Sequence, residues 1–230
     1  MGSVVFLGVF GQVTKPLLML DHDGVVVDSV EIFTTSFVEA CRRVGVSQIA
    51  TSDDVLALFG GNFYESLRAA GADEAQIGAA MSRTATALRL AMPALRPFPL
   101  MAEVLADLAE ARHLVIVSSN ASDVVELFLK RNGIGGVAEV AGAEAGRSKV
   151  AKIEALIARF PGQACYWFVG DTAGDMREAR LAGATPLGVA WGWHGREQLE
   201  EAGAECIADT PADLLAIVAP ELAADFLGTG

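Results

Sequence analysis

The sequence predicts an α/β fold in which a doubly wound, Rossmann-like parallel sheet is interrupted by an inserted all-helical domain. Three observations support this fold class. About five short apolar segments alternate with amphipathic helical patterns, which is typical of a parallel sheet. Residues 30–95 show helical patterns and no convincing strand. Hydrophobic residues make up 52% of the 230 positions, which is ample for a large buried core.

The first predicted strand, Leu17–Leu20, consists of four apolar residues and runs into Asp21-His22-Asp23-Gly24. An unbroken apolar run is typical of a strand that is buried on both faces of a parallel sheet. Because side chains alternate along a strand, Asp21 and Asp23 point the same way, and His22 points to the other face as a core or interface histidine. The glycine allows the backbone to turn directly after them.

The insert begins after Ser29, where the apolar residues start to recur at intervals of three and four. Four helices are expected there, over residues 30–44, 51–60, 63–70 and 74–92. Pro93 and Pro97 end the last of them. The predicted domains are therefore a core of residues 1–29 and 96–230 and an inserted helical domain of residues 30–95.

The α/β alternation resumes after the insert. Strands are expected over residues 113–117, 137–140, 166–169 and 186–190, the last clear strand. Helices are expected over residues 99–111, 122–132, 149–160, 173–181, 195–202 and 211–218. Ser122 or Asp123 is the expected cap of the second of these helices. Residues 1–13 are interpreted as an extra strand or a loosely packed tail.

The bulk composition restricts the partners. A net charge of −12 and a pI near 4.6 disfavour nucleic acid and anionic membranes. Three widely spaced cysteines indicate a reducing compartment, so the chain is expected to be cytoplasmic. No stretch is long enough to cross a membrane.

Four polar clusters stand at strand ends or helix starts and predict one site. They are Asp21 with Asp23, Ser119 with Asn120, Lys149, and Asp171 with Asp175. Ligands of open α/β sheets bind at the carboxyl ends of the strands. Of two carboxyl groups this close, either one stays protonated or a cation is present, and a hard oxygen site suits Mg²⁺. The hydroxyl and amide of Ser119-Asn120 can donate to phosphate oxygens. Lys152 or Arg147 could replace Lys149 in pairing with a carboxylate and a phosphate.

Taken together and in this order, these motifs resemble the haloacid dehalogenase (HAD) superfamily of phosphohydrolases. The pattern is Asp-x-Asp-Gly-Val-x-x-Asp-Ser, a strand ending in Ser-Asn, a lysine, and Gly-Asp-x-x-x-Asp. The helical insert resembles the cap domain of that superfamily. The segment over residues 188–215 is similar to phosphoglycolate-phosphatase-like members.

The resemblance implies a role for each candidate. Asp21 would attack phosphorus and form an aspartyl-phosphate, and Asp23 would act as the general acid and base. Ser119 and Lys149 would hold the transferring phosphoryl group. The implied Mg²⁺ ligands are Asp21, the backbone carbonyl of Asp23, Asp171, and Asp175 directly or through water. The expected substrate-binding residues are Asn120, Gly24 and Asn62.

The implied function is Mg²⁺-dependent hydrolysis of a small phosphorylated metabolite, of the phosphoglycolate or sugar-phosphate type. The carboxylate of Asp23 disfavours the dehalogenase branch, and the absence of lysine from residues 30–95 disfavours the phosphonate hydrolases. Two alternatives are a phosphomutase of the β-phosphoglucomutase type and a non-enzymatic interaction protein with the HAD fold. A monomer or a homodimer is expected.

Overall fold

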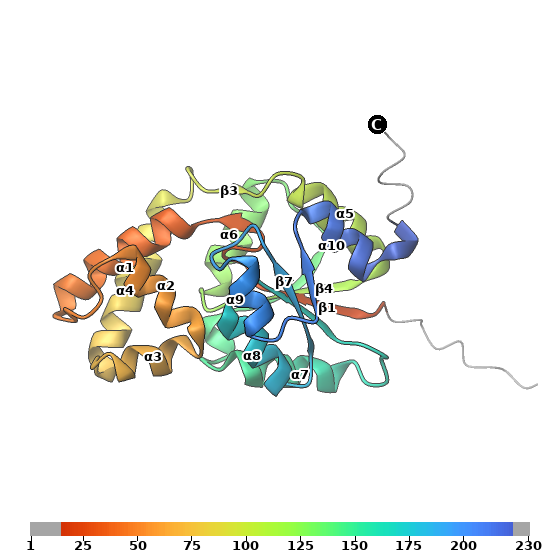
Figure 1. Cartoon of the computed structure of the whole chain (residues 1–230). Helices are drawn as coiled ribbons and strands as arrows, with labels where there is room; N and C mark the ends of the chain where they lie inside the picture. Colours follow the sequence, from red (N-terminus) through yellow and green to blue (C-terminus); the bar gives the residue numbers. More distant parts are fainter. Residues whose placement is uncertain (1–14, 223–230) are drawn as a thin grey trace, which may run out of the picture.

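The computed structural model describes residues 15–222 and confirms the α/β fold class. The predicted tail or extra strand at residues 1–13 lies outside the described residues. A parallel sheet of six strands has the order β5-β4-β1-β6-β7-β8. Figure 1 shows helices on both sides of this sheet. The strands are β1 Leu17–Leu20, β4 His113–Val117, β5 Val137–Ala141, β6 Trp167–Gly170, β7 Thr185–Val189 and β8 Cys206–Ala208.

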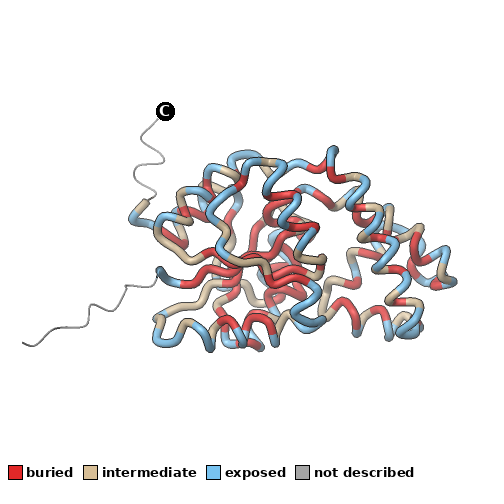
Figure 2. The backbone as a smooth tube through the Cα atoms, turned by 180° about the vertical axis from the view of Figure 1, so that it is seen from behind, coloured by how far each residue is buried: buried red, intermediate tan, exposed pale blue. Residues whose placement is uncertain are grey.

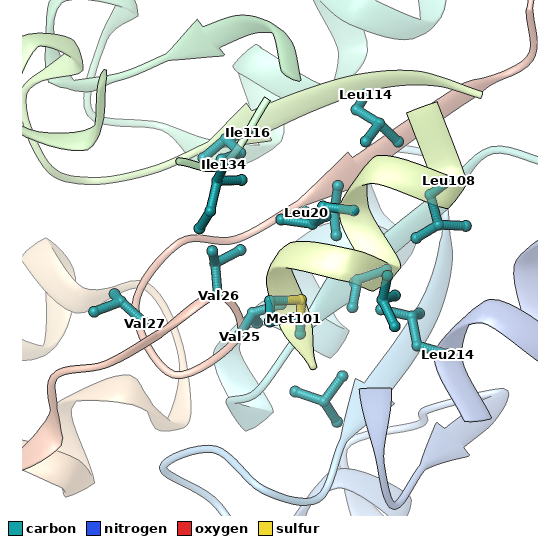
Figure 3. Packing of buried hydrophobic residues seen from close by; sticks show 14 of the residues in the cluster. Leu20, Val25, Val26, Val27, Met101, Leu108, Leu114, Ile116, Ile134 and Leu214 are labelled. Atoms are coloured by element: carbon teal, nitrogen blue, oxygen red, sulfur yellow. The ribbon is translucent and has the colours of Figure 1, made fainter. Parts of the chain in front are cut away.

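Strand β1 lies in the middle of the sheet and is buried on both faces, as its apolar sequence predicts. Leu18 and Leu20 pack into the hydrophobic cluster on one face, and Leu17 and Met19 pack into the cluster on the other. Figure 3 shows Leu20 among its neighbours in the first cluster. The red tube in Figure 2 marks the same buried centre.

The two faces of the sheet are covered by different helices. The first cluster contains residues from α5 Met101–Ala111, α6 Ser122–Arg131 and α10 Pro211–Val218. The second contains residues from α7 Lys149–Arg159 and α8 Ala173–Leu181. Helix α9 Arg196–Glu201 packs against α8 through Leu199 and Met176. The helices on the two faces and the sheet between them form the helix–sheet–helix layers of a doubly wound fold.

The inserted segment has a hydrophobic cluster of its own, built around residues such as Phe37, Leu67 and Ile77. Its elements are α1 Val30–Val44, α2 Ser52–Ala57, a 3₁₀ turn at Leu58–Gly60, α3 Phe63–Ala69 and α4 Glu74–Ala91. No strand lies between residues 30 and 95 of the described chain, as predicted. The domain boundaries at 29/30 and 95/96 stay a prediction.

Four elements differ from the sequence prediction. Strand β8 is a sixth strand that was not predicted, because it has three residues and is only partly buried. The two segments that connect the core to the insert pair as a two-stranded antiparallel ribbon, which consists of β2 Val27–Asp28 and β3 Arg96–Pro97. Helix α5 starts at Met101 and not at residue 99, because Leu100 has a left-handed backbone with φ 64°.

The predicted cap of helix α6 was also wrong. Ala121 occupies the N-cap position and makes no side-chain cap hydrogen bond. The hydroxyl of Ser122 instead donates to the carboxylate of Glu144 at 3.0 Å, in the neighbouring turn. Within residues 15–222, no helix combines the length and the apolar character needed to cross a membrane.

Candidate active site

The polar clusters predicted from the sequence meet at the carboxyl ends of β1, β4 and β6. Leu20 in β1 pairs with Ile116 on one side and Val169 on the other, so the three strands end at the same edge. The chain runs from β1 to β4 on one side and later returns to β6 on the other, which makes this edge a topological switch point. A small cavity, partly open to solvent, lies between this edge and the inserted helices.

Lys149 lies between two carboxylates, at the start of helix α7. Its Nζ donates to Asp21 Oδ2 at 2.7 Å and to Asp175 Oδ1 at 2.5 Å. The alternatives Lys152 and Arg147 make different contacts. Lys152 donates to the backbone carbonyl of Ser118 at 2.7 Å, and Arg147 pairs with Glu74 of the insert at 2.6 Å. Of these three cations, Lys149 is the one that contacts Asp21 in the described chain.

Asp171 and Asp175 follow strand β6 and begin helix α8. Asp175 closes a capping box with Thr172, since each residue binds the other's backbone N–H. Its Oδ2 also accepts a bond of 2.7 Å from the Thr172 hydroxyl. Asp171 Oδ2 accepts the backbone N–H of Trp193 at 2.8 Å. One oxygen from each of Asp21, Asp171 and Asp175 lies within 4.8 Å of the others.

Burial disfavours the ionised forms of two of these carboxyl groups, Asp21 and Asp171. Burial raises the pKa of Asp21 to about 6, although Lys149 opposes the shift. Burial and the charge of Asp175 raise the pKa of Asp171 well above its usual range. Burial disfavours the charged lysine, but Asp175 and Asp21 outweigh it and raise the pKa of Lys149. Three acids therefore face one ammonium, and a divalent cation would balance the remaining charge.

Asp23 has a different environment from Asp21. Its carboxylate accepts the Ser29 hydroxyl at 2.6 Å and the Asn120 amide at 2.5 Å, and His22 Nδ1 lies 3.5 Å away. Burial would raise the pKa of Asp23, but the hydrogen bonds from His22 and Ser29 outweigh it, so the pKa is lowered. The expectation for His22 is only partly met: it is buried against Phe128, but its Nε2 has no hydrogen-bond partner among the described residues.

Gly24 occupies a position that accepts no side chain. Its φ of +72° lies in the left-handed region, and a Cβ there would lie 1.8 Å from Asp171 Oδ2. The backbone N–H of Gly24 donates to the carbonyl of Val27 at 3.0 Å. The glycine thus lets the loop after β1 approach the carboxylate that follows β6.

Two serines follow strand β4, and both line the cavity with Asn120. The sequence prediction named Ser119 and missed Ser118, which is 1% exposed and comes directly after the strand. Ser118 Oγ accepts the backbone N–H of Asn120 at 3.0 Å. The Asn120 side chain donates to Asp23, and its role in substrate binding stays a prediction.

Asn62 lies at the cavity but is engaged by protein groups. Its Oδ1 caps helix α3 by accepting the N–H of Glu65 at 3.2 Å, and its Nδ2 donates to Glu178 of helix α8 at 2.8 Å. Sequence reasoning also missed Trp193, whose ring lies against Phe33 and Phe59 of the insert with centroids 5.0 and 4.8 Å away. Only the folded chain brings these aromatic residues together.

Comparisons with known proteins agree with this geometry. The family model of haloacid dehalogenase-like hydrolases matches residues 18–189. The phosphoglycolate phosphatase of Synechococcus elongatus is 31% identical over 206 residues, which covers 87% of this chain and 96% of the relative. A haloacid dehalogenase-like hydrolase from Streptococcus pneumoniae superposes with a TM-score of 0.70 at 21% identity, over 88% of this chain and 98% of that one. A hydrolase from Pseudomonas syringae also superposes with a TM-score of 0.70 at 21% identity, over 89% of this chain and 98% of that one.

Proposed function

The chain belongs to the haloacid dehalogenase-like hydrolase family, and from this premise we propose that it is a Mg²⁺-dependent phosphatase of small phosphomonoesters. The hydrolysis would pass through an aspartyl-phosphate on Asp21. In this proposal, residues 30–95 act as a cap domain over a core formed by residues 1–29 and 96–230. Phosphoglycolate and sugar phosphates are the first substrates to test, since a phosphoglycolate phosphatase is among the relatives.

Asp21 is the proposed nucleophile. Its carboxylate oxygen attacks phosphorus, a new P–O bond forms to Asp21, and the bond to the leaving oxygen breaks. Lys149, at 2.7 Å, favours the ionised carboxylate that this attack requires. Ser119 and Lys149 then donate to the oxygens of the transferring phosphoryl group, where charge develops. The neighbouring Ser118, which lines the same cavity, is a second candidate for this hydroxyl.

Asp23 is the proposed general acid and base. It gives its proton to the leaving oxygen in the first half of the reaction. In the second half it takes a proton from water, which attacks phosphorus and releases Asp21 and inorganic phosphate. The lowered pKa of Asp23 suits the base role. Approach of the anionic phosphate raises this pKa by charge repulsion, which suits the acid role.

The acidic side chains fit a magnesium ion. Asp21, Asp171 and the backbone carbonyl of Asp23 would hold it, and Asp175 would act through water because Lys149 and Thr172 already use its two oxygens. When bound, Mg²⁺ supplies positive charge that neutralises the carboxylates and the phosphoryl oxygens. The observation that carries the proposal is the convergence of Asp21, Asp171 and Asp175, with Lys149 bonded to the first and the last of them.

The test measures phosphate release from a panel of small phosphomonoesters, with and without Mg²⁺, by the wild type and by Asp21→Asn. We expect release that requires Mg²⁺ and falls by a factor of at least 10³ in the variant. Brief incubation and acid quenching should trap an acyl-phosphate on the wild type only. Activity that survives in Asp21→Asn would identify a different nucleophile. Transfer of phosphate to a second hydroxyl would indicate the phosphomutase, and a folded protein without any turnover would favour the interaction protein.

A further inference from the structure

One part of the cavity lining, referred to here as the wall, is apolar and mostly aromatic. It is formed by Phe33, Phe59, Phe63, Tyr64, Met81 and Trp193. The rings contact one another, with the Phe59–Phe63 centroids 4.7 Å apart and the Phe59–Trp193 centroids 4.8 Å apart. The part of a substrate beyond its phosphate would meet this wall, because the phosphate itself is held at the sheet edge. An apolar wall favours an apolar group.

The cavity offers little positive charge to a second anionic group. Among the described residues that line it, the cations are Lys149 and Arg147. Lys149 is bound to Asp21 and Asp175. Arg147 is bound to Glu74 at 2.6 Å and lies over the Tyr64 ring at 5.0 Å. A substrate carboxylate would compete with Glu74 for the charge of Arg147, and it would also face the carboxylate of Glu178 at the same cavity.

Trp193 carries a buried hydrogen-bond donor without an acceptor. Its Nε1 is shielded from solvent and has no partner among the described residues. The adjacent ring atom, Cδ1, lies 2.7 Å from the position that a Cβ on Gly24 would take. The N–H edge of the ring is therefore close to the residue that follows Asp23, the proposed proton donor to the leaving oxygen. The indole of Trp191, by contrast, donates to the Val25 carbonyl at 3.2 Å.

An unpaired buried donor costs free energy, so a substrate that supplies an acceptor to it binds more tightly. We propose that the natural substrate is a phosphomonoester whose leaving group is uncharged and mostly apolar and carries one hydrogen-bond acceptor, which Trp193 Nε1–H binds. This inference rests on the proposed phosphatase function and narrows its substrate class. It places phosphoglycolate, with its carboxylate, among the poorer substrates.

The test compares substrates that differ in one feature. Butyl phosphate and 2-methoxyethyl phosphate have equal numbers of non-hydrogen atoms, and only the second has an ether oxygen that accepts a hydrogen bond. We expect the wild type to hydrolyse the ether with a kcat/KM about fivefold higher than that of the alkyl ester, which is the gain from one hydrogen bond. Both should exceed phosphoglycolate and glycerol phosphate by about tenfold.

Trp193→Phe keeps an aromatic ring and removes the N–H. It should bring the ether-to-alkyl ratio close to one, while the matched control Trp191→Phe should leave that ratio unchanged. An unaltered ratio in Trp193→Phe would overturn the role of the indole. If the wild type prefers phosphoglycolate and Arg147→Gln abolishes that preference, the proposal of an uncharged leaving group is wrong, although the phosphatase function would stand. No release from any of the esters would instead refute the proposed function itself.

Discussion

The side-chain amide of Asn62 donates a hydrogen bond of 2.8 Å to the carboxylate of Glu178, and so joins the start of helix α3 in the insert to helix α8 in the core. The packing around this bond is close. Arg177 donates to the carbonyl of Gly60. A Cβ on Gly174 would lie 2.5 Å from the carbonyl oxygen of Gly61. Helix α8, which begins beside the carboxylates of Asp171 and Asp175, therefore also positions the insert over the cavity.

Asn62→Asp should weaken this contact without disturbing helix α3. Aspartate caps a helix as well as asparagine does, but it would place a second carboxylate against Glu178, which is already partly desolvated. Burial raises the pKa of Glu178. We expect kcat/KM to fall about tenfold with little change in thermal stability. Steady-state kinetics and thermal unfolding measure the two effects.

The double variant Asn62→Asp with Glu178→Gln is the control. The glutamine amide can donate to the new carboxylate, so activity should return to within about twofold of the wild type. If Asn62 instead contacts the substrate directly, as the sequence analysis expected, the second substitution would restore nothing. That outcome would return Asn62 to the substrate-binding set.

Sequence alone could place Asn62 on a turn before a helix, but its partner lies 116 positions away in helix α8. The same holds for Trp193, which meets Phe33 and Phe59 only in the folded chain. Asp21 was predictable because the apolar run before it fixes both the strand and the face of its side chain. Contacts that depend on how the insert sits over the core leave no local pattern in the sequence.

The metal-free protein should lose stability as the pH rises above about 4. A carboxyl group whose pKa is higher in the folded state than in the unfolded state favours folding at low pH, where it is protonated. That contribution is lost as the pH rises through the folded pKa. For Asp21, a shift from 3.8 to about 6 corresponds to about 3 kcal/mol, and the raised pKa of Asp171 adds to it. Chemical denaturation in a chelator at pH 4 and pH 8 measures most of this difference.

Added Mg²⁺ should reverse this loss at pH 8, because a bound cation favours the ionised carboxylates. Equal stability at the two pH values in the chelator would contradict the prediction. So would a magnesium effect that is as large at pH 4 as at pH 8.

Asp171→Asn separates the electrostatic effect of Asp171 from its role in the reaction. Removal of one of three clustered carboxylates should raise the Tm of the metal-free protein at pH 8 by about 5 °C. The same change should remove most of the Mg²⁺-dependent rise in Tm and reduce activity at least 10²-fold. A variant that is less stable than the wild type in the chelator would show that Asp171 supports the fold. The hydrogen bond from the Trp193 backbone N–H to the Asp171 carboxylate is one such contact.

Gly24→Ala should disrupt the site more than it disrupts the fold. The alanine Cβ would overlap Asp171 Oδ2, so we expect loss of activity and of magnesium stabilisation. Gly133→Ala is the matched control. Its φ of +67° is close to that of Gly24, but a Cβ there would have no neighbour within 4 Å. The control should lose about 1 kcal/mol of stability from backbone strain and keep its activity.

If both alanine variants keep their activity, the close approach of Gly24 to Asp171 is not required for function. If both lose it, backbone strain alone explains the effect. Circular dichroism melts and kcat/KM, measured on the same samples, distinguish these results.

Most of the features that sequence reasoning missed are either very short or depend on contacts made only in the folded chain. Strand β8 has three residues, and β2 and β3 have two each, so none shows a readable periodicity. Ala121 occupies the N-cap position of helix α6 although Ser122 follows it, because Glu144, which lies 22 positions further along the chain, binds the Ser122 hydroxyl. Leu100 takes a left-handed backbone that leucine disfavours. The strands are too short to show a local preference, and at Ser122 a tertiary contact replaced it. The described residues offer no such cause for the backbone of Leu100.

Ser29→Ala should shift the pH dependence of the second half of the reaction. The Ser29 hydroxyl donates to Asp23 Oδ1 at 2.6 Å and helps to hold the pKa of that carboxyl below its usual range. Without this bond the pKa rises, so Asp23 remains protonated to higher pH and cannot accept a proton from water. When dephosphorylation limits turnover, the acidic limb of the kcat profile should move up by about 0.7 pH units, the equivalent of one hydrogen bond. Ser52→Ala, which removes a hydroxyl bonded to Thr34 in the insert, should leave the limb in place. A limb that does not move in Ser29→Ala would mean that a group other than Asp23 activates the water.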